Sequence, residues 1–201
     1  MGGWITAASV AVLMAAVSAQ ETRTSGALER PLSANDRVKM DLVAADYRIT
    51  GSPENHVRID WTVHDAESLP KVQVFAEERQ READDCDEAP SNSHGRFTIQ
   101  LPNRSDLSVR LTAGSIDIED IRGNKDVQLR AGEMRVDVGR AEDYGMVDAS
   151  LWAGDINALA FQTFKGGLFR SFEWNGRGSY RLRARLIAGK IYLYSKAAEA
   201  R

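Results

Sequence analysis

Few side chains in this sequence have the type and spacing that metal binding requires. If His56 and His64 lie on one strand, they are about 26 Å apart at ~3.3 Å per residue, too far to share a metal ion. The third histidine, His94, lies near the end of an acidic run at 82–95 that also contains Cys86, without tetrahedral or EF-hand spacing. We therefore interpret this run as a solvated acidic loop and expect neither a metal ion nor a cofactor.

Nucleophilic and glycosidase chemistry also lack a recognisable site. The sequence has no G-x-S-x-G element and no glycine-rich phosphate loop. A glycosidase needs two carboxyl groups about 5–10 Å apart in a cleft. Six acids lie near expected strand ends: Asp117, Glu119, Asp120, Asp137, Glu142 and Asp143. Arginines alternate with them, which is typical of rows of opposite charge on the outer face of a sheet. We expect no catalytic residues and no enzyme activity, with a polysaccharide-acting enzyme on a β-helix as a remaining alternative.

The best candidate for a binding surface is a cluster of aromatic side chains at 161–180. Exposed aromatic rings can stack on sugars or contact another protein, whereas buried ones would brace the fold. Trp152 adds a further ring in a column that otherwise points outward, and arginines add local positive charge. The candidate binding residues are Trp152, Phe164, Phe169, Phe172, Trp174 and Arg177.

Composition limits the functions that these residues can have. The chain has 201 residues, 43% of them hydrophobic, and a net charge of −3, which predicts one domain with a real core. This near balance gives no sign of binding to nucleic acid or to an anionic membrane. Apolar residues alternate with polar ones after the first twenty residues, which favours an all-β fold.

The first residues resemble an export signal. An uncharged apolar run at 4–17 precedes small residues at 17–19, so we predict a signal peptide at 1–19, although no Lys or Arg precedes the run. The alternative is a short hydrophobic helix that stays attached. Cleavage would place the protein in the periplasm or outside the cell with no membrane span, a disordered lead at 20–35 and a tail at 197–201. The single cysteine excludes an internal disulfide.

One pattern recurs along the chain and predicts how these residues are positioned. Leu, then Ala two places on, then Gly, then Ile or Met two places further, occurs in four copies, with a weaker copy at 40–51. The inward-facing set changes from odd to even numbers at each glycine, which indicates a bend where only glycine suits the backbone. The predicted structural corners are Gly114, Gly132, Gly154 and Gly189.

The spacing of the copies predicts a stack of short strands. Gly114, Gly132 and Gly154 are separated by 18 and 22 residues, near the range of solenoid repeats. We expect a single-domain β-solenoid, β-helix-like, at 36–196, with a less regular antiparallel strand region at 36–104 and the repeat core at 105–196. The longer interval at 161–180 predicts a hairpin, or an extra irregular layer, with turn signals at 166–167 and 175–176.

At this repeat the sequence resembles a bacterial family of "putative adhesin", β-strand-repeat proteins of unknown function. The stretches VRLTAGSIDIEDIRGNKDVQLRAGEMRV and GRGSYRLRARLIAGKIYLY carry the resemblance. It implies a stacked β scaffold and no agreed catalytic residues. Our first hypothesis is a structural or adhesin-like interaction module of the bacterial envelope, whose partner is an envelope protein or a glycan and not nucleic acid. The second is a carbohydrate-binding module that uses the aromatic residues of 161–180. The sequence predicts no oligomeric state.

Overall fold

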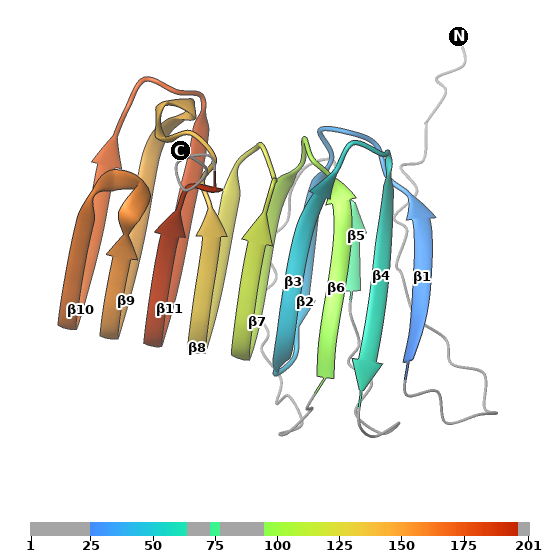
Figure 1. The fold of residues 1–201 in the computed structure, drawn as a ribbon, viewed down its shortest axis with the longest axis horizontal. Coiled ribbons are helices and arrows are strands. Elements are labelled where there is room, and N and C mark those ends of the chain that lie inside the picture. The colour runs from blue at the N-terminus through green and yellow to red at the C-terminus, as the bar shows by residue number, and fades with distance from the viewer. Residues whose placement is uncertain (1–24, 64–72, 77–94, 197–201) are drawn as a thin grey trace, which may run out of the picture.

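The computed structural model describes residues 25–63, 73–76 and 95–196, and this part of the chain is all-β, as the alternating pattern predicts (Figure 1). Two single-turn 3₁₀ helices, η2 (Ala141–Asp143) and η3 (Leu159–Phe161), interrupt the strands. The strands are β1 (Ser25–Pro31), β2 (Arg37–Leu42), β3 (Ala45–Ser52), β4 (His56–Val63), β5 (Gln73–Ala76), β6 (Gly95–Pro102), β7 (Asp106–Glu119), β8 (Lys125–Asp137), β9 (Tyr144–Ala158), β10 (Thr163–Asn175) and β11 (Tyr180–Tyr194).

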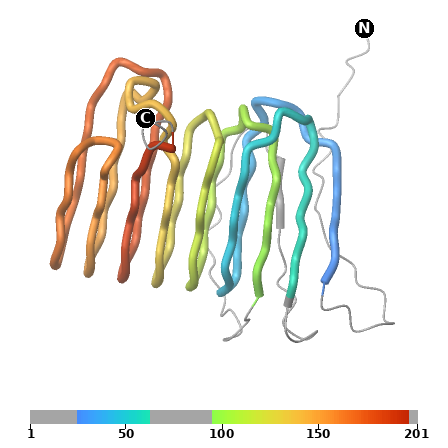
Figure 2. Tube along the Cα trace, viewed as in Figure 1, coloured from blue at the N-terminus to red at the C-terminus, as the bar shows by residue number. Residues whose placement is uncertain are grey.

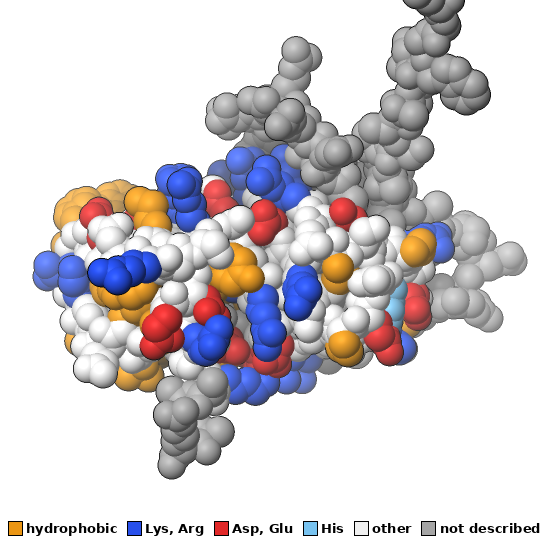
Figure 3. All heavy atoms as spheres, turned by 90° about the horizontal axis from the view of Figure 1, so that it is seen from above, with side chains coloured by type: hydrophobic (Ala, Val, Ile, Leu, Met, Phe, Trp, Pro, Cys, Tyr) orange, Lys and Arg blue, Asp and Glu red, His pale blue; other side chains and the backbone are white. Residues whose placement is uncertain are grey.

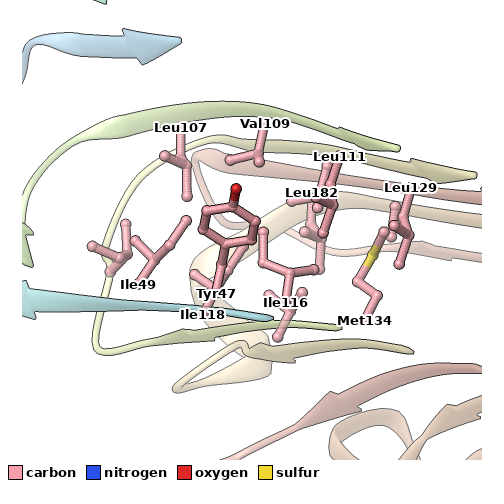
Figure 4. Packing of buried hydrophobic residues seen from close by; sticks show 14 of the residues in the cluster. Tyr47, Ile49, Leu107, Val109, Leu111, Ile116, Ile118, Leu129, Met134 and Leu182 are labelled. Carbon is pink, nitrogen blue, oxygen red and sulfur yellow. The ribbon is translucent and has the colours of Figure 1, made fainter. Parts of the chain in front are cut away.

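The long strands fold back on themselves. Each of β7, β8, β9, β10 and β11 runs down one layer, bends, and returns in a facing layer, and the bends line up along one edge of the stack (Figures 1 and 2). The apolar residues of the two arms meet between the layers. Leu107, Val109 and Leu111 face Ile116 and Ile118 across the core, and all five are buried (Figure 4). The change of inward phase at the glycine therefore lets both arms point at one interior.

The corner glycines form a single row across neighbouring strands. Gly114 pairs with Gly132, Gly132 with Gly189, and Gly189 with Gly154. At Gly132 the backbone φ is +132°, and a Cβ atom there would press against the carbonyl oxygen of Gly114 on the next strand. Glycine is required both by the left-handed backbone and by the close approach of the strands. The adjacent alanines were expected inside a tight corner, but Ala131 and its neighbours lie at least partly exposed on the outer side of the bend.

The order of strands departs from that of a simple solenoid. The main path is β1-β4-β6-β3-β7-β8-β11-β9-β10, in an open, mixed sheet. Strand β11 lies between β8 and β9 and is parallel to both. In a regular solenoid each strand lies beside the equivalent strand of the preceding coil. Here β9 does not lie beside β8, and the last strand of the chain, β11, lies between them. The repeat defines the bent shape of each long strand, and long-range pairing decides the order of the strands in the sheet.

The antiparallel pairs lie at the two ends of this path. Strand β4 pairs antiparallel with β1 and β6, but β3 is parallel to β6 and β7, so the region 36–104 is antiparallel only in part. The prediction of a disordered lead at 20–35 is wrong for Ser25–Pro31, because these residues hydrogen-bond along β4 from Thr62 to His56. The predicted signal peptide at 1–19, most of the acidic run at 82–95 and the predicted tail at 197–201 lie outside the described residues.

The hairpin expected within 161–180 is not formed there, because this segment contains one long strand, β10, which forms a hairpin with the preceding strand β9. Strand β10 pairs antiparallel with β9, and the turn between them is η3 with Gln162 in the left-handed conformation. The pair Gly166-Gly167 is not a turn but lies at the bend of β10, where Gly167 pairs with Gly154. The signal at 175–176 does mark the end of β10.

Candidate functional site

Four exposed apolar side chains lie side by side on the outer side of the bends. Ile187 of β11 and Trp152 of β9 each precede their Ala-Gly corner, and Phe169 and Leu168 occupy the bend of β10. Their exposed fractions are 47% for Ile187, 56% for Trp152, 74% for Phe169 and 62% for Leu168. We call these four residues the corner ridge.

The two aromatic rings of the corner ridge contact each other. The ring centroids of Trp152 and Phe169 are 5.9 Å apart, and their planes are tilted by 42°. Phe169 has a backbone φ of +53°, a conformation that bulky residues rarely adopt and that costs about 1–3 kcal/mol. A glycine or asparagine would suit this backbone better, so stability alone does not explain an exposed phenylalanine here.

A second group of aromatic residues closes the β10 end of the core. The Phe161 ring centroid lies 5.4 Å from that of Phe172 and 5.1 Å from that of Trp174. Phe172 is only 5% exposed, and Phe161 and Trp174 are partly buried against the core. These three rings therefore contribute to packing.

The structure thus divides the six predicted binding residues. It brings Trp152 and Phe169 together and places Phe164, 67% exposed, beside Gly166 near the same bend. Phe172 and Trp174 belong to the packed group, and Arg177 lies in the loop between β10 and β11. Sequence reasoning missed Leu168 and Ile187. The signal for Ile187 was an apolar residue in the same repeat position as Trp152.

A cleft of about 1200 Å³ lies among the loops on the edge of the stack opposite the bends, which we call the loop end. Acidic and basic side chains are mixed over this end, as Figure 3 shows. Arg140 Nη2 lies 2.7 Å from Asp143 Oδ1, and Lys196 Nζ donates to Glu119 at 3.0 Å and to Asp120 at 3.2 Å. The hydrogen bonds to Glu119 and Asp120 raise the pKa of Lys196. These acids are held by cations, which is the arrangement expected for structural charge rows.

The cleft also borders a buried cation. Lys125, 2% exposed, pairs with Leu107 and Leu182 in neighbouring strands and so occupies a core position. Its Nζ donates hydrogen bonds to the carbonyl oxygen of Ile121 at 2.7 Å and to the hydroxyl of Tyr144 at 2.6 Å. Burial lowers the pKa of Lys125 to about 8, opposed by the charges of nearby carboxylates. Lys125 ties the loop after β7 to the start of β9.

Residues 25–63, 73–76 and 95–196 contain neither a cluster of metal ligands nor a membrane-spanning helix. Within these ranges His, Cys, Asp and Glu form no group of three or more that could hold a metal ion. In the same ranges no helix has the length and apolarity needed to cross a bilayer.

Comparison with known proteins adds a likeness of fold. No protein-family model matches the chain, and no curated protein matches it. A solved structure, that of a "putative cell adhesion protein" from Clostridium sporogenes ATCC 15579, superposes with a TM-score of 0.50 over 86% of this chain and 100% of that one. The two sequences are 12% identical. The likeness is one of fold.

Proposed function

We propose that this chain is an exported, non-enzymatic interaction module of the bacterial envelope with an adhesin-like role. The observation that carries the proposal is the corner ridge. Large apolar side chains gathered on a surface are typical of binding sites, whereas singly scattered ones are ordinary. The signal-like residues at 1–19 support export to the periplasm or the outside of the cell.

The scaffold suits a binding role because it holds the ridge rigidly. Trp152 and Ile187 each follow a leucine of the buried column, Leu151 or Leu186. Hydrogen-bonded ladders run along both sides of β9 and of β11. A backbone held in this way needs no ordering on binding, which favours affinity.

The fold of the Clostridium sporogenes structure is consistent with this role, because that protein is described in terms of cell adhesion. The cleft at the loop end does not favour the enzyme alternative. Two of its four acids, Asp120 and Asp143, are paired with Lys196 and Arg140. A neighbouring cation favours the ionised form of a carboxyl group, whereas a glycosidase needs one carboxyl group held protonated.

Binding to bacterial envelopes tests the proposal. The full chain is mixed with isolated cell envelopes, and the bound fraction is measured by sedimentation. We expect Trp152→Ser to reduce binding about tenfold, because the loss of the ring removes the contact of an exposed aromatic side chain. Leu159→Ser is the matched control, since Leu159 is 60% exposed but lies in η3, outside the ridge. Equal binding by the wild type and Trp152→Ser would refute the proposal.

A carbohydrate-binding module is the second candidate, favoured by the contact of Trp152 with Phe169. The sequence assigned this role to the aromatic residues of 161–180, but one of them, Trp174, packs against Phe161. A glycan array with wild type and Trp152→Ser separates this candidate from the first. Sugar binding that is lost in the variant supports it, and absence of binding to every glycan removes it.

A further inference from the structure

We propose that the corner ridge, together with the basic side chains beside it, docks this protein on an anionic lipid surface. The inference rests on the proposed function and names its partner. It concerns peripheral binding and requires no segment that spans the bilayer.

The shape of the ridge favours a lipid surface over an enclosed ligand. The bends of β7, β8, β11, β9 and β10 form one projecting edge of the stack (Figures 1 and 2). Sites for small molecules are concave and surround their ligands. Trp152, Leu168, Phe169 and Ile187 instead project from an outer bend, with 47–74% of each residue exposed. Tryptophan is enriched at membrane interfaces, and Phe, Leu and Ile can enter the acyl region.

The size of the ridge also favours lipid over a second folded protein. A stable protein complex buries about 800 Å² on each partner. An aromatic side chain contributes at most about 250 Å², and the four residues of the ridge are already partly covered. They therefore offer less area than a stable protein interface uses. A lipid surface adapts to a narrow edge, and electrostatic attraction adds to its affinity.

The charge beside the ridge complements anionic headgroups. Arg130 lies next to Ile187 across the β8–β11 pair, and Arg185 and Lys190 flank Ile187 along β11. Lys165 and Arg170 flank the bend of β10. All five are exposed.

On β8, β11, β9 and β10 the acids in the same rows, Glu133 and Asp155, are fewer than these five cations, and the other acids of these rows, Asp41 and Asp46, lie farther away on β2 and β3. The net charge of −3 for the whole chain hides this local excess of positive charge. This is why the composition alone gave no sign of membrane binding.

Two hydrogen bonds hold cations of β10 close to the ridge. Lys165 Nζ donates to the carbonyl oxygen of Ser171 at 2.7 Å, and Arg170 Nε donates to that of Gly166 at 2.6 Å. Both bonds cross the bend that contains Leu168 and Phe169. The positive charges therefore remain near the apolar side chains, so a lipid surface would meet both together.

Vesicle binding tests the inference. The full chain is titrated with vesicles of equal parts phosphatidylglycerol and phosphatidylcholine, and with vesicles of phosphatidylcholine alone. We expect binding to the anionic vesicles that weakens with salt, a drop of about tenfold for Trp152→Ser, and no change for the matched control Leu159→Ser. For Arg130→Gln and Arg185→Gln we expect about a fivefold loss per charge on anionic vesicles and no loss on neutral ones. The apolar run 4–17 is present in every variant, so differences between variants report on the ridge.

Trp152→Phe provides a local readout. It should keep most of the affinity but lose the part of the vesicle-induced blue shift that comes from Trp152, because Trp61 and Trp174 pack against the core and Trp4 is the same in both proteins. Absence of vesicle binding, equal binding to neutral vesicles, or equal binding by Trp152→Ser would overturn the inference. If envelope binding still depends on Trp152 in that case, the proposed function stands and its partner is not lipid.

Discussion

Each corner glycine meets two constraints at one residue. The positive φ excludes most side chains, and the carbonyl oxygen of the next strand occupies the place where a Cβ would lie. The neighbouring residue, Glu133, meets neither constraint, because its side chain is 42% exposed and forms only a 3.8 Å ion pair with Arg135. Adjacent positions of the repeat should therefore respond very differently to substitution.

We expect Gly132→Val to lower the free energy of unfolding by about 3 kcal/mol or more, from backbone strain and overpacking. The melting temperature should fall by about 10 °C, whereas Glu133→Ser should change it by about 1–2 °C. Thermal unfolding followed by circular dichroism measures both. Equal melting temperatures for the two variants would contradict the role of the corner.

Lys125 should make stability depend on pH. Its pKa is 10.5 in an exposed lysine and about 8 in the folded protein, so between these values the unfolded chain binds the proton and the folded chain does not. Stability therefore rises with pH in this window, by about 2 kcal/mol from pH 7.5 to pH 9.5. Below about pH 8 the penalty for burying the charge is fully present.

Urea unfolding of the wild type and Lys125→Met across this window measures the effect. The variant should lose the rise, because methionine fills the position among Leu107 and Leu182 without a charge. Above pH 10 the raised pKa of Tyr144 acts in the opposite direction, so the comparison ends at pH 9.5. A rise of the same size in both proteins would contradict the assignment to Lys125.

At the scale of the element, β10 shows how one strand serves both packing and the surface. It is the last strand on its side of the sheet and pairs with β9 alone among the described strands. Phe172 turns into the core, whereas Phe169 at the bend turns outward. The same residue type therefore has different tasks three positions apart.

We expect Phe172→Ala to lower the free energy of unfolding by about 3 kcal/mol, because it leaves a cavity against Phe161. Phe169→Ser should change it by about 0.5 kcal/mol or less, since this side chain is 74% exposed. Chemical denaturation of the two variants provides the measurement. A larger loss for Phe169→Ser than for Phe172→Ala would show that the assignment of the two rings is reversed.

The sequence alone could predict the bent shape of each long strand but not the position of that strand in the sheet. The phase change at Gly114 and the buried leucines are local features, and the structure has them as expected. The sequence predicted turns at 166–167 and 175–176, but Gly166-Gly167 lies at a bend, because a glycine pair suits either geometry and only the pairing of Gly167 with Gly154 decides between them. Whether an aromatic residue of β10 is packed or exposed also depends on long-range pairing, because pairing decides which side of this edge strand faces the core.

At the scale of the whole molecule, the placement of β11 has a consequence for folding. This strand follows all the others in the chain, yet it lies between β8 and β9 and forms parallel ladders with both. Until it is present, the edges of β8 and β9 that it covers lack a partner, and the β9–β10 hairpin has no parallel neighbour in the described sheet. Contacts of such large sequence separation form late in folding and connect distant parts of the chain.

A chain that ends at Ser179 should therefore lose the fold from β8 onward. Removing β11 deletes the buried Leu182, Leu186 and Ile191 and exposes strand edges that promote aggregation. Circular dichroism and hydrogen exchange of the truncated chain should show no protected amides in β9 and β10. A chain that begins at Leu32 is the control, because β1 is the only described strand that it loses, and β1 pairs with β4 at the opposite end of the path. If the chain ending at Ser179 kept native protection in β9 while the control unfolded, β9 and β10 would be an independent unit and the inserted strand would not couple the molecule.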